Sequence, residues 1–194
     1  RLLSRGLGDV YKRQAWYEND GTPSDGGWTH HIVKDYSGNG IDDLFVADID
    51  DDGDLDIISS DAGGDKILYH INDGTPGNGV WTTNTVVSGS DADGAMSVHV
   101  SDIDTDGDLD IVAALFIAAE VIWIENDGSP NNGGWTLHDV SDSTGKESYD
   151  VTVADIDGDG DLDILEADQS NKIYWFENDG TPDDGTWSMT KIKG

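Results

Sequence analysis

The sequence contains no cysteine and few cationic side chains, since Lys and Arg number 10 against 41 Asp and Glu, a formal net charge of -31 at pH 7. Without cysteine the chain forms neither a disulfide framework nor a thiolate zinc site. The shortage of Lys and Arg argues against nucleic acid and anionic membranes as partners, because both require a basic surface. No apolar run approaches the ~20 residues of a membrane-spanning helix, so membrane insertion is not expected. Cations are the natural small partners of such a chain.

The chain is nevertheless expected to fold. Hydrophobic residues make up 36% of it and include 7 Trp, 6 Tyr and 3 Phe, which are large enough to fill a core that a disordered acidic segment lacks.

The first fourteen residues, RLLSRGLGDVYKRQ, differ from the remainder because they hold four of the ten basic side chains. They have no apolar region and no small-residue cleavage site, so they are not a signal peptide. We expect residues 1–14 to be a non-native leader and the natural chain to extend further upstream.

Two sequence markers recur with one period. The first is VADIDDDGDLDII at 46–58, VSDIDTDGDLDIV at 100–112 and VADIDGDGDLDIL at 153–165, at spacings of 54 and 53 residues. The second is Asn-Asp-Gly, which begins at Asn19, Asn72, Asn126 and Asn178 and is followed each time by a tryptophan, namely Trp28, Trp81, Trp135 and Trp187. Agreement between two independent markers indicates a tandem repeat.

Each unit shows short β-rich runs and period-two patterns without helical periodicity. The third unit predicts four strands, at 149–156, 162–168, 172–178 and 187–192, separated by turn-forming residues. Before the first complete unit stand only the equivalents of a third and a fourth strand, at 15–20 and 28–33. The expected division is therefore an outer half unit at 15–33 and complete units at 34–87, 88–140 and 141–194, or fourteen strands.

A four-stranded unit of this length in tandem is typical of a β-propeller blade. The predicted fold is all-β, with about three and a half four-stranded antiparallel blades that form a fragment of a larger propeller. An alternative is that two copies of this chain together complete one propeller ring. A short open stack is disfavoured because its terminal strands would be exposed edges.

Each unit also carries the pattern D-x-D-x-D-G-D-L-D. The aspartates are Asp48, Asp50, Asp52, Asp54 and Asp56, then Asp102, Asp104, Asp106, Asp108 and Asp110, then Asp155, Asp157, Asp159, Asp161 and Asp163. Five carboxylates in nine residues repel one another unless a cation neutralises them, and oxygen ligands at this spacing suit Ca²⁺ better than the smaller Mg²⁺. The alternative of solvated turn aspartates is disfavoured by three identical spacings. We predict three Ca²⁺ sites.

The third loop also satisfies the EF-hand pattern, because Glu166 stands at position 12. Ser59 and Ala113 occupy this position in the sister loops, and strand-forming residues flank all three loops where an EF-hand requires helices. Glu166 is therefore expected to be a strand residue.

These motifs resemble those of the FG-GAP or VCBS repeat family, over residues 15–194. The resemblance implies integrin-α-like propeller blades that hold Ca²⁺ in the hairpin between the first two strands. It further implies side-chain ligands at loop positions 1, 3, 5 and 9 and main-chain carbonyl ligands from Asp54, Asp108 and Asp161. The Phe-Gly and Gly-Ala-Pro elements are missing, so kinship is with the VCBS branch and integrin-type ligand recognition does not carry over.

The aromatic and histidine positions favour structure over a ligand site. Every tryptophan occupies a position used in all units, which suits packing between blades better than contact with a carbohydrate. The histidines show no metal-ligand spacing and are expected on strand surfaces. One stretch breaks the repeat: the expected turn at 113–120 reads AALFIAAE and places Leu115, Phe116 and Ile117 where a polar turn should be. These three are a candidate partner contact, with burial against a neighbour as the alternative.

The leading hypothesis is a calcium-stabilised binding module of a secreted or cell-surface protein, bacterial and environmental in origin, which recognises an extracellular polysaccharide or protein. Its alternatives are the propeller portion of a secreted polysaccharide lyase or other carbohydrate-active enzyme, and a structural spacer of a large adhesin. No Ser-His-Asp, H-E-x-x-H or phosphate-loop pattern is present, which favours binding over catalysis in this chain.

Overall fold

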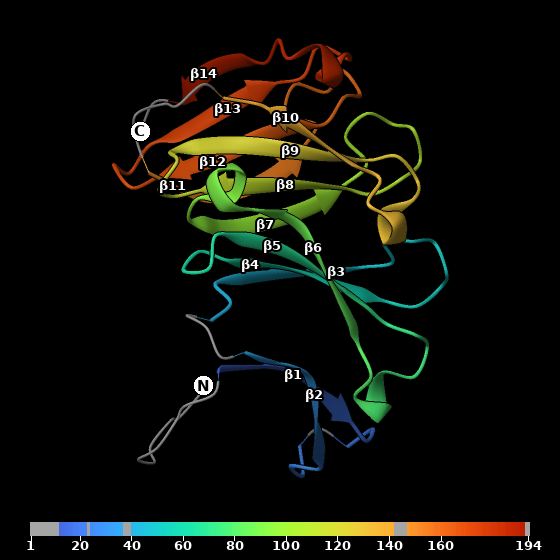
Figure 1. Cartoon of the computed structure of the whole chain (residues 1–194). Helices are drawn as coiled ribbons and strands as arrows, with labels where there is room; N and C mark the ends of the chain where they lie inside the picture. Colours follow the sequence, from blue (N-terminus) through green and yellow to red (C-terminus); the bar gives the residue numbers. More distant parts are fainter. Residues whose placement is uncertain (1–11, 23, 37–39, 142–146, 193–194) are drawn as a thin grey trace.

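The computed structural model describes residues 12–22, 24–36, 40–141 and 147–192. These residues form fourteen β-strands and four short 3-10 turns, with no α-helix among them (Figure 1). None of the described segments is a helix that is long and apolar enough to cross a bilayer. The fold is therefore all-β, as the sequence predicts.

Twelve strands form three antiparallel sheets of four, each in chain order. Sheet 1 contains β3 (Asp43–Ala47), β4 (Asp56–Asp61), β5 (Lys66–Ile71) and β6 (Thr82–Ser88). Sheet 2 contains β7 (Ala95–Ser101), β8 (Asp110–Leu115), β9 (Glu120–Asn126) and β10 (Trp135–Asp139). Sheet 3 contains β11 (Ser148–Ala154), β12 (Asp163–Asp168), β13 (Ile173–Glu177) and β14 (Ser188–Ile192). The remaining pair, β1 (Lys12–Asn19) and β2 (Trp28–Tyr36), forms a separate hairpin that begins inside the segment 1–14 set apart by its charge.

The hairpin and the three sheets stack face to face in chain order (Figure 1), and the described sheets do not close into a ring. Between sheets, the first strands β3, β7 and β11 make most of the close backbone contacts. The predicted unit of four antiparallel strands is confirmed.

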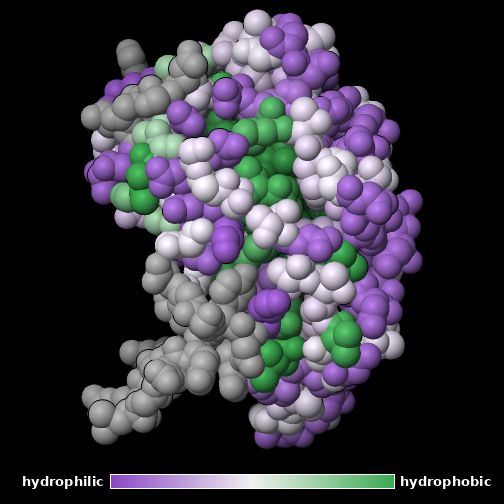
Figure 2. Space-filling view, viewed as in Figure 1, coloured by the Kyte–Doolittle hydropathy of each residue, from purple (hydrophilic) through white to green (hydrophobic). Residues whose placement is uncertain are grey.

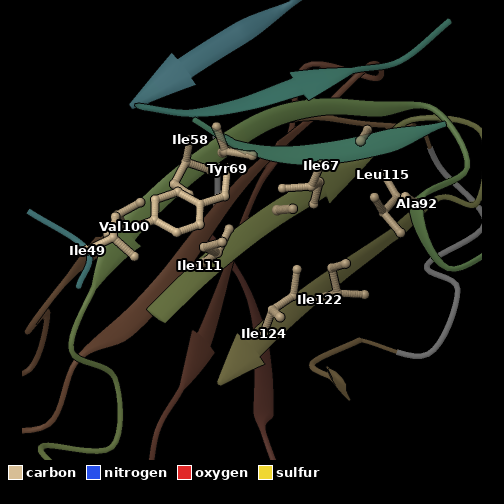
Figure 3. Close-up of a cluster of buried hydrophobic side chains, with 13 residues drawn as sticks. Ile49, Ile58, Ile67, Tyr69, Ala92, Val100, Ile111, Leu115, Ile122 and Ile124 are labelled. Carbon is tan, nitrogen blue, oxygen red and sulfur yellow. The ribbon is translucent and has the colours of Figure 1, made fainter. Parts of the chain in front are cut away.

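Strand β8 shows why the stack has a core between each pair of sheets. After Asp110 its residues are apolar without alternation, and the whole strand is buried. Ile111 and Ala113 pack toward sheet 1 in a cluster with Ile58 and Tyr69 (Figure 3), whereas Val112 packs toward sheet 3. A strand covered on both faces needs apolar residues at every position, so sheet 2 is the centre of the described stack.

Sheet 1 has a face that is only half covered. Leu44 on β3 is 52% exposed, whereas Val98 and Val151 at the equivalent positions of sheets 2 and 3 are 3% and 5% exposed. Hairpin β1–β2 corresponds only to the third and fourth strands of a unit, so it lies over the outer part of sheet 1. It has no equivalent of the first and second strands, which cover this position in the other sheets, and Leu44 is therefore exposed. A cavity of about 320 Å³, bordered by Ala15 and Leu44 among others, lies between the hairpin and the inner strands.

Candidate metal centres

The aspartate loops all lie at the same edge of the stack. Each loop connects the first strand of a sheet to the second, as in β3 to β4, and the three loops project on the right-hand side of Figure 1. That side of the molecule is mainly hydrophilic in the space-filling view (Figure 2). The hairpin geometry therefore gathers the carboxylates of each unit at one rim.

Three carboxylates converge in every loop. One oxygen from each member of a group lies within 4.8 Å of the others, and the groups are Asp48, Asp50 and Asp52, then Asp102, Asp104 and Asp110, then Asp155, Asp157 and Asp163. The members occupy loop positions 1, 3 and 5 in the first loop and positions 1, 3 and 9 in the other two. Each acidic cluster could hold a metal ion.

The backbone of the loop turns inward onto these carboxylates. The Gly53 N–H donates to Asp48 Oδ2 at 3.0 Å, and the Gly107 N–H donates to Asp102 Oδ2 at 3.2 Å. The sixth position adopts φ of 94° at Gly53 and 105° at Gly107, a region that disfavours side chains. Glycine is thus required where the loop folds back over its first aspartate.

The ninth aspartate is buried at the base of each loop. Asp56, Asp110 and Asp163 have no solvent exposure. Burial raises the pKa of Asp56 to about 6 and that of Asp110 to about 7. A positive charge close by would lower the pKa of these carboxyls again and favour their anionic form.

The Asn-Asp-Gly turn fastens this base to the neighbouring hairpin. The Asn126 N–H donates to Asp110 Oδ1 at 2.8 Å, and its side-chain Nδ2 donates to the Leu109 carbonyl at 3.2 Å. Asn72 and Asn178 make the same pair of bonds in their own units. In the sequence this motif is a repeat marker, and its recurrence at a fixed distance from the aspartate loops is the signal of a role in the site.

The seventh aspartate has a different environment from the converging groups. A Cβ at Gly74 would lie 2.7 Å from Asp54 Oδ2, and a Cβ at Gly128 would lie 2.7 Å from Asp108 Oδ2. Asp161 stands in the same relation to Gly180. These side chains contact the Asn-Asp-Gly turn, which explains why that motif ends in glycine and why the seventh carboxylate is absent from the converging groups.

The chemistry of the loops fits a hard cation. Asp50 Oδ1 and Asp102 Oδ1 are buried and accept no hydrogen bond. Histidine supplies the cation in the pairs His31–Glu18 and His138–Glu125, and no ion pair between a described Lys or Arg and a loop aspartate is seen. A donor set made only of oxygens, with orphaned carboxylate oxygens at its centre, suits the divalent cations that prefer oxygen ligands.

The candidate partner contact at 115–117 is largely corrected by the structure. Leu115 ends β8 with no solvent exposure and packs near Ala92 (Figure 3). Phe116 is half-buried against Tyr149 of sheet 3, at a ring-centroid distance of 5.1 Å. Only Ile117, 60% exposed, faces solvent. The run is apolar because its first two residues pack against neighbouring sheets.

The tryptophans follow the packing interpretation where a neighbouring sheet is present. Trp123 is fully buried, and Trp135 and Trp187 pack against the clusters between sheets, whereas Trp28 is 47% exposed. Trp28 begins β2, in the hairpin at the end of the described stack, beyond which no further described sheet lies (Figure 1).

The prediction for the histidines is wrong at His70. This residue is fully buried, with Nε2 2.9 Å from Ser59 Oγ and Nδ1 3.0 Å from Thr83 Oγ1. Burial lowers the pKa of His70 to about 4, so the ring is neutral. Hydroxyl groups from the two flanking strands satisfy both nitrogens, and period-two patterning alone did not reveal this pairing.

Comparison with known proteins agrees with these features. Residues 48–113 match the family model described as an FG-GAP-like repeat. The matched segment holds the first two aspartate loops and the strands between them. No curated protein matches the chain.

Proposed function

We propose, from the premise that residues 48–113 are an FG-GAP-like repeat, that this chain is part of a calcium-stabilised extracellular β-propeller that binds a polysaccharide or a protein. The observation that carries the calcium assignment is the convergence of three carboxylates in each of three equivalent loops. FG-GAP repeats suggest a propeller-like module and are typical of extracellular proteins.

The loop geometry favours Ca²⁺ over Mg²⁺. The five aspartates of each loop carry more oxygen atoms than a six-coordinate ion needs, and those at positions 1 and 3 converge with the aspartate at position 5 or position 9. Mg²⁺ retains its water and demands near-ideal octahedral geometry, which a crowded carboxylate cluster does not provide. Extracellular Ca²⁺ is also abundant enough to fill sites of modest affinity.

The half-covered face of sheet 1 supports further blades. Val46 is 47% exposed, whereas its equivalent Val100 is 6% exposed under β3 and β4 of the preceding sheet. The inner two strands of another blade would cover Leu44 and Val46 as these strands cover sheet 2. We propose that the described sheets belong to a larger propeller.

The calcium assignment is tested by thermal melting and by ion counting. At a free Ca²⁺ concentration of about 100 times Kd each site adds about 2.7 kcal/mol, so three loops would add about 8 kcal/mol. Chelation should therefore lower the melting temperature sharply. Asp104→Ala should remove one bound ion per chain, and Asp139→Ala, an exposed aspartate on β10, should remove none. A melting temperature that is equal with EDTA and with Ca²⁺ would refute the assignment.

The binding function is tested separately, with the Ca²⁺-loaded protein on an array of extracellular polysaccharides and glycoproteins. Retention on a defined glycan without release of cleaved product supports a binding module. Release of product would support the alternative, a propeller portion of a carbohydrate-active enzyme, and no retention on any ligand would leave the spacer of an adhesin as the better description.

A further inference from the structure

A second group of acidic residues lies inside the stack, away from the aspartate loops. Glu166 and Asp168 lie on the same face of β12, and Ser148 of β11 is the cross-strand partner of Asp168. All three are buried, with exposures of 1% for Glu166, 6% for Asp168 and 0% for Ser148. Ile164, two residues before Glu166, packs toward sheet 2, so the group faces the interface between sheets 2 and 3.

Four oxygen atoms of this group have no hydrogen-bond partner: Glu166 Oε1 and Oε2, Asp168 Oδ2 and Ser148 Oγ. The other Asp168 oxygen accepts the Lys172 N–H at 2.9 Å. None of the ion pairs found among the described residues involves Glu166 or Asp168. Two carboxylates buried side by side, with one main-chain donor for Asp168 and no cation among the described residues, would be strongly destabilising as anions.

Sheet 2 shows what this position contains when it serves packing alone. Its equivalent residues are Ala95, Ala113 and Leu115, and all three are fully buried. The fold therefore tolerates apolar side chains at these three places. The carboxylates of sheet 3 are not required for the sheet to form, which points to a separate role.

We propose that Glu166, Asp168 and Ser148 bind a hard divalent cation, with Ca²⁺ as the expected ion, between sheets 2 and 3 and at the end of the strands opposite the aspartate loops. The four unpartnered oxygens supply part of the six to eight ligands that Ca²⁺ takes, and water completes the shell. The site would join β11 to β12 at the end where the loops do not reach.

A proton is the competitor of the cation. Burial raises the pKa of Glu166, the nearby Ser148 hydroxyl opposes this rise, and the neighbouring Asp168 carboxylate adds to it. A neutral Glu166 would relieve the charge without any metal. The two possibilities differ in the number of ions bound, which can be measured.

The test counts the Ca²⁺ ions bound per chain by elemental analysis. The full chain is first dialysed at about pH 7.5 against a buffer of fixed free Ca²⁺ concentration. Glu166→Gln should bind one ion fewer than wild type. The triple variant Ser148→Ala, Glu166→Ala, Asp168→Leu places the residues of sheet 2 in sheet 3, and it should also lose one ion while it keeps its β circular dichroism. Equal counts in wild type and the triple variant would overturn the proposal and leave a protonated Glu166.

The loops provide the internal reference. Asp104→Ala, combined with the triple variant, should remove a further ion, because the two sites share no ligand. If Asp104→Ala changes nothing while Glu166→Gln lowers the count, the loop assignment fails and the interior site stands. The two proposals are thus separable in one series.

Discussion

The backbone N–H of Asn72 donates a 2.8 Å hydrogen bond to Oδ1 of Asp56, the buried last aspartate of the first loop. Asn126 and Asn178 repeat the contact with Asp110 and Asp163. The start of the Asn-Asp-Gly turn thus holds the base of the aspartate loop in each of the three four-stranded units. A residue outside the D-x-D-x-D-G motif thereby becomes part of the site.

Asn126→Ala should weaken the second loop. The substitution removes the bond from Nδ2 to the Leu109 carbonyl and the bond that Oδ1 accepts from the Gly128 N–H. Loss of two hydrogen bonds at a buried position should lower the free energy of unfolding by about 1–3 kcal/mol. Calorimetric Ca²⁺ titration should show one weakened site. Asn132→Ala, at an exposed position of the same turn region, is the control and should match wild type. Equal effects of the two substitutions would contradict a holding role for Asn126.

Removal of the metal should expose an unusual pH dependence. The raised pKa of Asp110, about 7, means that the folded metal-free protein keeps a proton that the unfolded chain releases above its ordinary pKa of 3.8. The stability of the metal-free protein should therefore fall as pH rises from about 4 to about 7, by a few kcal/mol at most. Because Ca²⁺ needs the ionised carboxylate, its stabilising effect should grow over the same interval.

This expectation is tested by measuring the melting temperatures of the metal-free and the Ca²⁺-loaded protein from about pH 5 to about pH 8. Asp110→Asn serves as the control because asparagine has no titratable proton. In the metal-free variant the melting temperature should therefore fall less as pH rises. An unchanged slope in Asp110→Asn would show that the pH dependence arises from the other carboxylates.

Thr105 is strained in the second loop. It adopts φ of 62°, whereas the fourth position of the third loop is Gly158, with φ of 83°. A β-branched residue in this region costs about 1–3 kcal/mol, and glycine avoids this cost at some loss of chain entropy. Thr105→Gly should therefore stabilise the metal-free protein by about 1 kcal/mol, measured by urea unfolding. Thr136→Gly, in β10, should destabilise it, and the reverse order would refute the strain argument.

Much of this architecture was predictable because it is local. The loop motif and the period-two runs around it predicted the β11 to β14 strands to within one or two residues. Clustering of the loop aspartates followed from the same motif, because a hairpin returns the ninth position to the first. Such features depend on residues close together in the chain, so a repeat presents them several times.

Contacts between units were not predictable in this way. The Ser97 hydroxyl lies 2.9 Å from a carboxylate oxygen of Asp43 and 2.9 Å from one of Asp150, and the three residues belong to three different units. Burial of Leu115 and of Glu166 likewise depends on which sheet lies opposite. Position within a repeat predicts the face on which a side chain lies, but the neighbour that covers that face is set by the stacking of sheets.

Exposure of the inner strands of sheet 1 should make the isolated chain self-associate. Leu44 and Val46 are 52% and 47% exposed on the sheet face, and among the described strands β1 pairs only with β2, so none of these strands covers its other edge. Apolar faces and free strand edges both promote association between chains. Light scattering across a concentration series should therefore show growing mass for the wild-type chain. Leu44→Ser with Val46→Thr should reduce this growth, whereas Val80→Ser, at a 62% exposed residue in the turn before β6, should not. A wild-type chain that remains monomeric at every concentration would show that the half-covered face needs no further strands, and would remove the main support for additional blades.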